Sequence, residues 1–371
     1  MYSNNYLVAF SEVASSVLST VLAIVLLLAM ITVHEFGHYI SGKILGFKIE
    51  EFAIGFGPAI IKKTKKSGEK FSVRALPLGG FCAFYGEDNK GEVKEDGFND
   101  KPVWKRIIVM ISGALMNYIF ALLIIMLSFG IYGANAVKIT SLEGLEEKTE
   151  QTLCEGDVIV KAQGKNVYLI TDLMKAIKDK EKGEIVELTV VRDGEKQSLS
   201  VSLLTDTNFE SVEDYSRLCY SLGAYKTAQD GTYGGLETTN VRLGFFETIG
   251  KGFEYSFKLA GTIFTVLGEL LTGRIGLSSM GGTITTLSAT ANAVKVGGFK
   301  NFLYMGSFIG VNLAVFNLLP IPALDGSRVI FCIIEGIRKK PLNRKVEGII
   351  HTVGLIALLM FAVMVDLMQC F

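Results

Sequence analysis

Four stretches of the chain contain no Asp, Glu, Lys or Arg and are rich in Leu, Ile, Val, Phe and Ala. They cover residues 13–33, 107–137, 301–324 and 348–365. A helix needs about 20 residues to cross a hydrocarbon core of about 30 Å, so each stretch is close to or above the length of a membrane span. One such stretch would suit a buried helix of a soluble protein. Four of them indicate a multi-pass membrane protein that lies in a lipid bilayer.

Basic residues around these stretches predict their orientation, because short cytoplasmic loops are enriched in Lys and Arg. No Lys or Arg precedes residue 13, whereas residues 43–106 and the short loop at 338–345 are both rich in them. We therefore expect both basic loops in the cytoplasm, and both termini and residues 138–300 outside. The first stretch does not resemble a cleavable signal peptide, because no basic residue precedes it and it ends in His34-Glu35.

The segments between the spans predict further structure. Residues 47–85 alternate imperfectly and carry GFGP and PLGGF at their ends, which favours a β region. A strand at 157–161, a helix at 172–180 and a hairpin around Asp193-Gly194 predict a small soluble α+β domain. Residues 206–244 are polar and rich in Gly, Thr and Tyr, so we expect a linker or an irregular insertion there.

The resulting domain plan starts with a first transmembrane helix within residues 1–40. The segments that follow are a cytoplasmic, membrane-associated β region and loop at 41–106, a second helix at 107–137, the α+β domain at 138–205, a linker and amphipathic helix region at 206–300, a third helix at 301–335 and a fourth at 348–368. Residues 245–271 are apolar but interrupted by five charges, which favours a helix lying at the membrane interface. A tilted span packed against protein is the alternative.

Composition narrows the function classes. Of 371 residues 49% are hydrophobic, and the formal net charge is zero, so no overall field points to a nucleic-acid partner. The five cysteines have no metal-type spacing. Cys154 and Cys219 both fall in the outer segment, where a disulfide between them or two unpaired roles are both open.

The strongest chemical signal is HEFGH at residues 34–38, at the end of the first span. Positions i and i+4 of a helix share one face, so His34 and His38 can bind one zinc ion, with Glu35 placed as general base. A pair of satisfied core histidines is the alternative. However, ionisable residues at membrane depth are costly and usually functional.

A catalytic zinc site usually takes three protein ligands. Asp325 is the candidate third ligand, because it follows the third span in NLLPIPALDGS, where Pro320 and Pro322 break the helix. Unwound backbone at membrane depth is tolerated only where protein or a water cavity surrounds it. A helix N-cap is the other role open to Asp325.

These motifs resemble the bacterial site-2 protease family of intramembrane zinc metalloproteases, single-PDZ type. The resemblance rests on HEFGH, GALMN at residues 113–117 and NLLPIPALDG, each in a separate span, and it covers nearly the whole chain. It implies zinc at His34, His38 and Asp325, with Glu35 as the catalytic base. It also implies a PDZ-like outer domain and a bacterial plasma-membrane location.

The resemblance further implies roles for residues that bind substrate. Asn317 matches the family asparagine near the substrate, and Asn117 matches the asparagine of the GxxxN element. The expected substrates are single-span membrane proteins already cut by another protease, such as anti-sigma-factor-like proteins or signal-peptide remnants. An unwound substrate segment could pair as an added strand with the β region. We place that contact at Val73, Arg74, Gly79 and Gly80.

Three positions depart from the family pattern. Ser327 stands where a second glycine is common, Gly281-Gly282 stands where GP is common, and residues 148–155 lack the usual small-residue stretch. None of these changes removes a ligand. An inactive scaffold would have lost Glu35 or a ligand, and a metal transporter would carry more intramembrane carboxylates and histidines.

Overall fold

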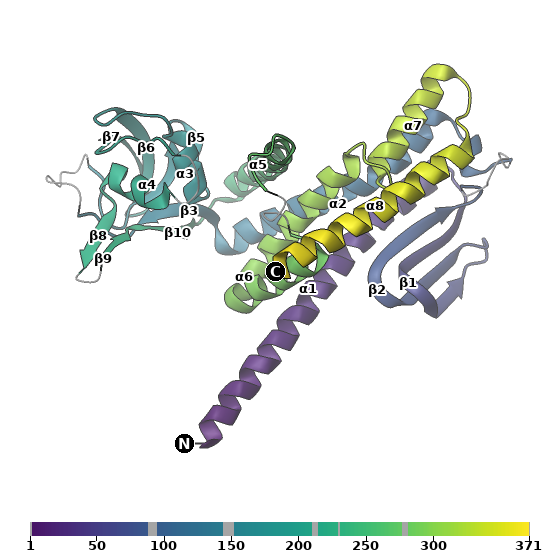
Figure 1. Ribbon diagram of the computed structural model, residues 1–371, viewed down its shortest axis with the longest axis horizontal. Coiled ribbons are helices and arrows are strands. Elements are labelled where there is room, and N and C mark those ends of the chain that lie inside the picture. Colours follow the sequence, from purple (N-terminus) through teal and green to yellow (C-terminus); the bar gives the residue numbers. More distant parts are fainter. Residues whose placement is uncertain are drawn as a thin grey trace. The chain divides into compact units, whose positions relative to one another are not determined.

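The computed structural model describes residues 2–87, 95–143, 152–209, 214–228, 231–276 and 281–370 (Figure 1). It divides into two compact units. Unit 1 consists of residues 1–127 and 252–371, and unit 2 consists of residues 128–251. Residues 88–94, within the segment at 41–106 predicted as a β region and loop, lie outside the described residues. So do residues 144–151, which include the first part of the stretch at 148–155 that differs from the family pattern.

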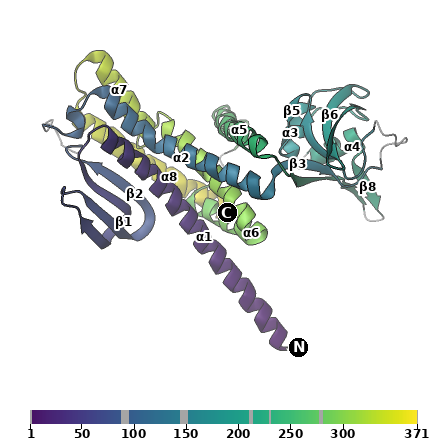
Figure 2. The ribbon, with the colours of Figure 1, turned by 180° about the vertical axis from the view of Figure 1, so that it is seen from behind.

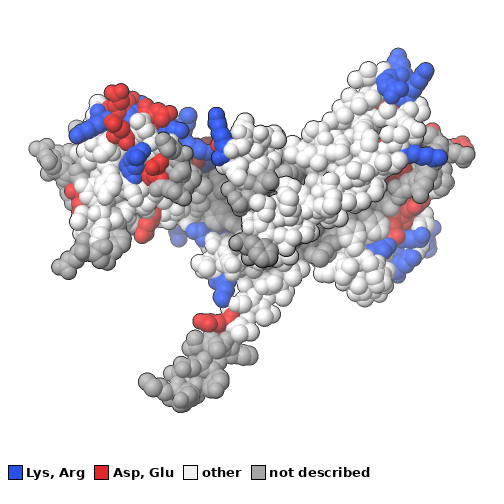
Figure 3. All heavy atoms as spheres, in the orientation of Figure 1, with Lys and Arg blue, Asp and Glu red and all other residues white. Residues whose placement is uncertain are grey.

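Unit 1 is built mainly from long helices. They are α1 (Tyr2–Ile44), α2 (Val103–Tyr132), α5 (Phe245–Leu271), α6 (Thr283–Leu318), α7 (Asp325–Arg338) and α8 (Arg344–Cys370). The last residues of α2 and the first residues of α5 belong to unit 2. A short 3₁₀ turn, η1 (Phe98–Asp100), precedes α2. Among the described residues, four helices are long and apolar enough to cross a membrane: α1, α2, α6 and α8. This confirms the four predicted spans as elements. On the face drawn in Figure 3, these helices present mainly uncharged surface.

The limits of two predicted spans are wrong. The second helix ends at Tyr132, because Gly133 adopts a left-handed φ of +85°, and residues 134–137 belong to strand β3 (Ala134–Ile139). Their lack of charge reflects burial in a sheet rather than in lipid. The third span was placed at 301–335, but it is two helices, α6 and α7, which Pro320 and Pro322 separate. Helix α6 also begins earlier, at Thr283, and is kinked at Gly298 (φ 57°, ψ −141°).

Strands β1 (Ile49–Thr64) and β2 (Lys70–Phe84) form the predicted β region, a long hairpin beside α1 (Figure 2). Each strand bends, so residues 51–54 pair with 80–83 on one side and with 70–73 on the other. Residues 70–73 pair in turn with 61–64. Two strands therefore act as four short ones, with residues 80–84 at one edge. Gly79 (φ +113°) makes a bend that any side chain would block, because a Cβ there would lie 1.9 Å from the Phe56 ring.

A polar cluster attaches the hairpin turn to α1. The largely buried Glu69 accepts hydrogen bonds from Tyr39 Oη (2.7 Å) and Lys65 Nζ (2.8 Å), and Lys43 Nζ lies 3.0 Å away. Burial raises the pKa of the Glu69 carboxyl, but these three partners outweigh it and lower the pKa to about 2. Because Tyr39 follows His38, the hairpin is anchored next to the predicted metal ligands.

Unit 2 is an antiparallel sheet with two short helices. The sheet runs in the order β10 (Leu236–Val241), β3, β4 (Val158–Ala162), β6 (Ile185–Arg192) and β7 (Glu195–Ser202), with β5 (Lys165–Asn166) beside β4; the helices are α3 (Ile170–Ala176) and α4 (Tyr215–Leu222), and β8 (Tyr225–Ala228) pairs with β9 (Gly231–Gly234). The expected hairpin around Asp193-Gly194 is β6 and β7. The buried Asp157 binds Arg192 through two hydrogen bonds of 2.7 and 2.8 Å, which joins β4 to β6.

The predicted linker at 206–244 is wrong in its described part. Strand β10 pairs along its whole length with β3 and so completes the sheet, and α4 buries Leu218, Cys219 and Leu222 in the same core. The segment is polar because its elements leave many side chains uncovered, as in the sequence LETTNV of β10, where only Leu236 is buried. The disulfide left open in the sequence is not formed, since Cys154 and Cys219 are both free.

Candidate metal centre

Three side chains from α1 and α7 bring their metal-binding atoms together. His34 Nε2 lies 3.0 Å from Asp325 Oδ2, His38 Nε2 lies 3.2 Å from the same oxygen, and the two Nε2 atoms are 3.2 Å apart. His38 is buried, and His34 and Asp325 are largely buried. The sequence placed the two histidines in the first span and Asp325 after the third, and the fold brings all three side chains together.

The hydrogen bond of His38 fixes its tautomer. Nδ1 of His38 lies 2.8 Å from the backbone carbonyl of Val109, which can only accept, so Nδ1 carries the proton. The lone pair of His38 is therefore on Nε2 and points towards Asp325. A second interaction of this kind is what orients metal-binding histidines in proteins.

Asn117 plays the matching part for His34. Its side chain is fully buried, its amide nitrogen is 3.5 Å from His34 Nδ1, and its Oδ1 has no hydrogen-bond partner among the described residues. Turning the amide by 180° places Oδ1 to accept a hydrogen bond from His34 Nδ1, and the two orientations of an amide are not distinguished by shape. We assign that orientation, which leaves the His34 lone pair on Nε2.

The donor set fits a zinc ion. Two imidazole lone pairs and a carboxylate oxygen repel one another unless a cation lies between them, and imidazole with carboxylate is a donor set that zinc takes. Ligand atoms about 2.0–2.1 Å from a tetrahedral ion are about 3.3 Å apart. The observed separations of 3.0–3.2 Å are close to that value. Three protein ligands leave one position open, as in catalytic zinc sites.

The site depends on a close crossing of α1 and α2. A Cβ on Gly113 of α2 would lie 2.5 Å from His38 Nε2 and 2.8 Å from His34 Cε1. A Cβ on Gly37 of α1 would lie 2.3 Å from the carbonyl oxygen of Ser112. Glycine at both positions lets the two helices approach closely, as small residues do in membrane helix pairs. Alanine at position 113 would displace the imidazoles.

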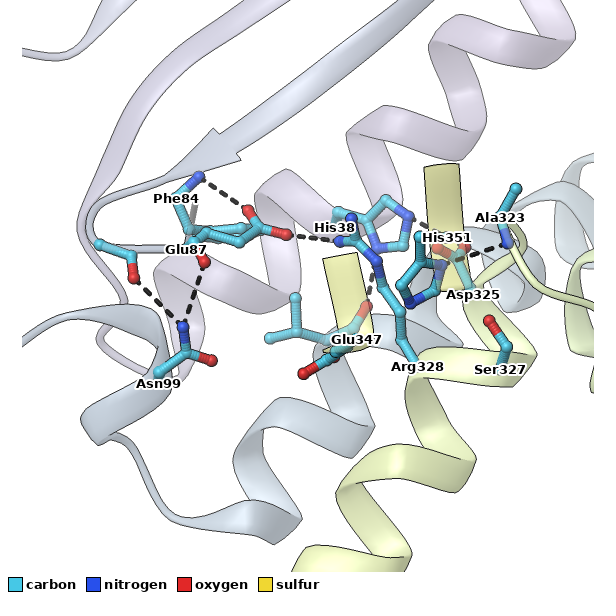
Figure 4. A network of polar contacts seen from close by, with 12 residues as sticks. His38, Phe84, Glu87, Asn99, Ala323, Asp325, Ser327, Arg328, Glu347 and His351 are labelled. Atoms are coloured by element: carbon cyan, nitrogen blue, oxygen red, sulfur yellow. Dashed lines mark hydrogen bonds and ion pairs between the residues drawn. The ribbon is translucent and has the colours of Figure 1, made fainter. Parts of the chain in front are cut away.

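The start of α7 holds Asp325. The N-cap of this helix is Leu324, and Asp325 makes no side-chain capping bond, so the alternative N-cap role is wrong. In the turn before it, the Ala323 N–H donates to His351 Nδ1 of α8 at 3.1 Å (Figure 4). Ser327, the departure from the family glycine, is buried and donates to the Leu324 carbonyl at 2.7 Å, so serine is accommodated there.

Glu35 follows His34 and faces the edge of the hairpin. A Cβ on Gly80 would lie 3.4 Å from Glu35 Cγ, which shows how closely the main chain of β2 approaches this carboxylate. The general base proposed from HEFGH thus lies between the metal ligands and residues 80–84. Gly80 is the member of the predicted substrate contact that the fold brings to the site.

The other predicted substrate residues are placed differently. Val73 pairs with both Ile54 and Ile61, so it lies inside the folded-back sheet and not at the expected free edge. Arg74 binds Glu51 at 2.8 Å and the Gly57 carbonyl at 2.9 Å. Val73→Pro or Arg74→Pro would therefore disrupt the hairpin itself and cannot isolate substrate binding.

Asn317 lies half-buried on the last turn of α6 and, among the described residues, makes no hydrogen bond to the three ligand candidates. Two residues near the centre were not predicted to act there. Gly113 stands in the GALMN motif, where a glycine in an uncharged span signals a close helix contact. His351 has no such signal, because its partner is a backbone N–H that the sequence does not reveal.

Comparison with known proteins supports this chemistry. The model of peptidase family M50 matches residues 22–361. A protein of Fusobacterium nucleatum named as a zinc metalloprotease is 30% identical over 352 residues, covering 93% of this chain and 96% of its own length. One from Clostridium perfringens is 31% identical, with 91% and 94% covered. The regulator of sigma-W protease RasP of Bacillus subtilis is 27% identical, with 94% and 97% covered.

We expect purified protein to contain one zinc ion per chain, and Asp325→Ala to lose most of it, because two imidazoles alone hold the ion weakly. Metal content measured by mass spectrometry after dialysis checks this. The matched control is Asp366→Asn, which removes a carboxylate of α8 that hydrogen-bonds the start of α6 instead. Zinc content in Asp325→Ala equal to that of the control would remove Asp325 from the ligand set.

Proposed function

The chain belongs to peptidase family M50, the site-2 protease family, and is a zinc metalloprotease; we propose that it hydrolyses peptide bonds within the transmembrane segments of single-span membrane proteins that another protease has already shortened. The observation that carries the proposal is the convergence of His34 and His38 from α1 with Asp325 from α7, with Glu35 beside the histidines. Anti-sigma-factor-like proteins and signal-peptide remnants are the substrate classes we propose. The printed name of the Bacillus subtilis relative, a regulator of sigma-W protease, favours the first.

The chemistry follows from the placement of the residues. Zinc, when bound, lowers the pKa of a water molecule to about 7 and polarises a carbonyl group. Glu35 takes a proton from the attacking water and returns it to the leaving amine. Asn117 and the Val109 carbonyl keep both imidazoles in the tautomer that directs Nε2 to the metal. Asn317, on the last turn of α6, is assigned to the substrate side of the centre.

The edge of the hairpin supplies a place for an unwound substrate. A helix hides its peptide groups in internal hydrogen bonds, so the substrate must become extended before cleavage. Among the described residues, 80–84 pair with one strand segment only, residues 49–54, and Gly80 of this segment lies beside Glu35. We propose that the substrate adds as a strand along this edge. The bend at Gly79 then sets where the added strand begins.

The basic loops support a plasma-membrane orientation with the hairpin and the loop at 338–345 in the cytoplasm. Unit 2 and the N-terminus then lie outside. We propose that unit 2, a PDZ-like domain by resemblance, restricts access by bulky ectodomains. Its antiparallel sheet with two helices is compatible with that role.

Glu35→Gln should keep a full complement of zinc and lose turnover by about 100-fold or more, because it removes the base and spares the ligands. Cleavage of a model transmembrane peptide, measured together with metal content, provides the check. Turnover near that of the unmodified enzyme would show that another group accepts the proton.

Strand addition predicts a two-residue pattern in the substrate. Replacing single backbone amides near the cut with esters removes one N–H donor and leaves every side chain unchanged. Because alternate residues of a strand point their N–H groups to the same edge, cleavage should fall several-fold at every second position. Esters weaken the substrate helix at all positions alike, so the alternation is the signal. A uniform profile would exclude edge pairing.

The orientation can be tested without catalysis. Single cysteines at Lys65 and Arg344 should react with a membrane-impermeant reagent only from the cytoplasmic side, and one at Lys196 only from outside. The parent for this test lacks the five native cysteines. Labelling of position 196 from the cytoplasm would reverse the proposed topology.

A further inference from the structure

Unit 1 contains a cavity of about 830 Å³ that none of the three metal-ligand candidates lines. The start of α2, the side of α7, the first turns of α8 and η1 line it. Its charged and titratable lining includes Arg106, Arg328, Arg344, Lys345, Glu347 and His351. Neither the metal chemistry nor the substrate edge uses these side chains. Figure 4 shows His351 and Arg328 close to Asp325.

The arginines are held in place by carboxylates. Arg106, 2% exposed, binds Glu335 through two nitrogens, and Glu335 also accepts from Arg344 at 2.8 Å. Arg344 further binds Glu347 at 2.8 Å. These bonds fix the guanidinium groups in one arrangement, so their remaining N–H groups are directed before any ligand arrives.

Two buried nitrogens in this lining have no hydrogen-bond partner among the described residues, Arg344 Nε and His351 Nε2. Both are donors. A guanidinium nitrogen has no acceptor capacity, and His351 accepts from the Ala323 N–H on Nδ1, so its proton is on Nε2. Leaving a buried donor unpaired costs about 1–3 kcal/mol, so an acceptor that reached either nitrogen would stabilise this part of unit 1.

Charge favours an anion as that acceptor. Four cationic side chains line the cavity together with two carboxylates, Glu87 and Glu347, and Glu335 pairs with Arg106 and Arg344, so one positive charge is in excess. Residues in the first turn of α8, the end of a helix that favours negative charge, also line the cavity. We propose that this cavity binds a phosphate group, held by Arg344, Lys345 and His351. A phospholipid headgroup and a soluble phosphate compound share this chemistry, and the cavity's apolar lining at Ile349 and Val353 is compatible with a lipid chain.

The phosphate site is joined to the metal centre by short connections. His351 holds the N–H of Ala323, two residues before Asp325, and Arg328 lies one turn of α7 after Asp325 and binds Glu87 at the end of the hairpin. An anion that satisfies His351 Nε2 therefore braces the turn that carries the third ligand. The binding itself is independent of proteolysis and is measured without it.

The test uses the full-length zinc-loaded protein and two probes. In detergent, sodium phosphate is compared with sodium chloride at equal ionic strength. In nanodiscs, phosphatidylglycerol is compared with phosphatidylcholine. The thermal unfolding midpoint should rise with saturation for a bound ligand. Lys345→Gln and Arg344→Lys should weaken the apparent affinity about 5- to 10-fold, since each removes one charge-assisted contact. Lys340→Gln, in the same basic loop but outside the lining, is the control.

Saturation by phosphate in detergent would identify a soluble phosphate, and a rise confined to phosphatidylglycerol nanodiscs would identify a lipid headgroup; both support the site. Equal shifts in the unmodified protein and in both lining variants would place the anion elsewhere, for instance at the metal, and would overturn the proposal. So would the absence of a saturable shift with either probe.

Discussion

Three lone pairs that point at one another, in a largely buried part of unit 1, form the constraint on which the rest of this unit depends. His34, His38 and Asp325 can share this point only with a cation between them and only if their own elements come very close. Hence α1 and α2 cross with glycines at the contact, and hence α6 stops short of Asp325. The metal and the helix packing are two aspects of one requirement.

The break between α6 and α7 leaves backbone groups without their helical hydrogen-bond partners. Backbone groups freed by Pro320 and Pro322 cannot be left unpaired near lipid. Some of these groups are paired within the turn at 319–324, such as the Ile321 N–H with the Leu319 carbonyl at 2.8 Å. The Ala323 N–H donates instead to His351. A histidine side chain of α8 thus supplies one hydrogen-bond partner that the broken helix lacks, two residues before the proposed ligand Asp325.

Some of this architecture is readable from sequence and some is not, for physical reasons. An uncharged run of about 20 residues and a pair of histidines four apart are local signals, and so the spans and the histidine pair were predicted. The sheet of unit 2 was only half predicted, because β10 buries only Leu236 and pairs with β3, about 100 positions earlier in the chain. The folded-back hairpin was missed because residues 51–54 and 70–73 gain a second strand partner where each strand bends, and the sequence carries no local signal for which segments pair.

Helix α8 buries little of its surface: 6% of its most apolar 18-residue stretch is buried, against 39% of the corresponding stretch of α2. It is held instead at three points, by Arg344 to Glu335, by His351 to Ala323 and by Asp366 to the start of α6. Because it follows α7 in the chain, the ribosome delivers it after every ligand has been made. The turn that precedes Asp325 therefore lacks its contact with His351 until α8 has been synthesised, and only its own hydrogen bonds hold it before then.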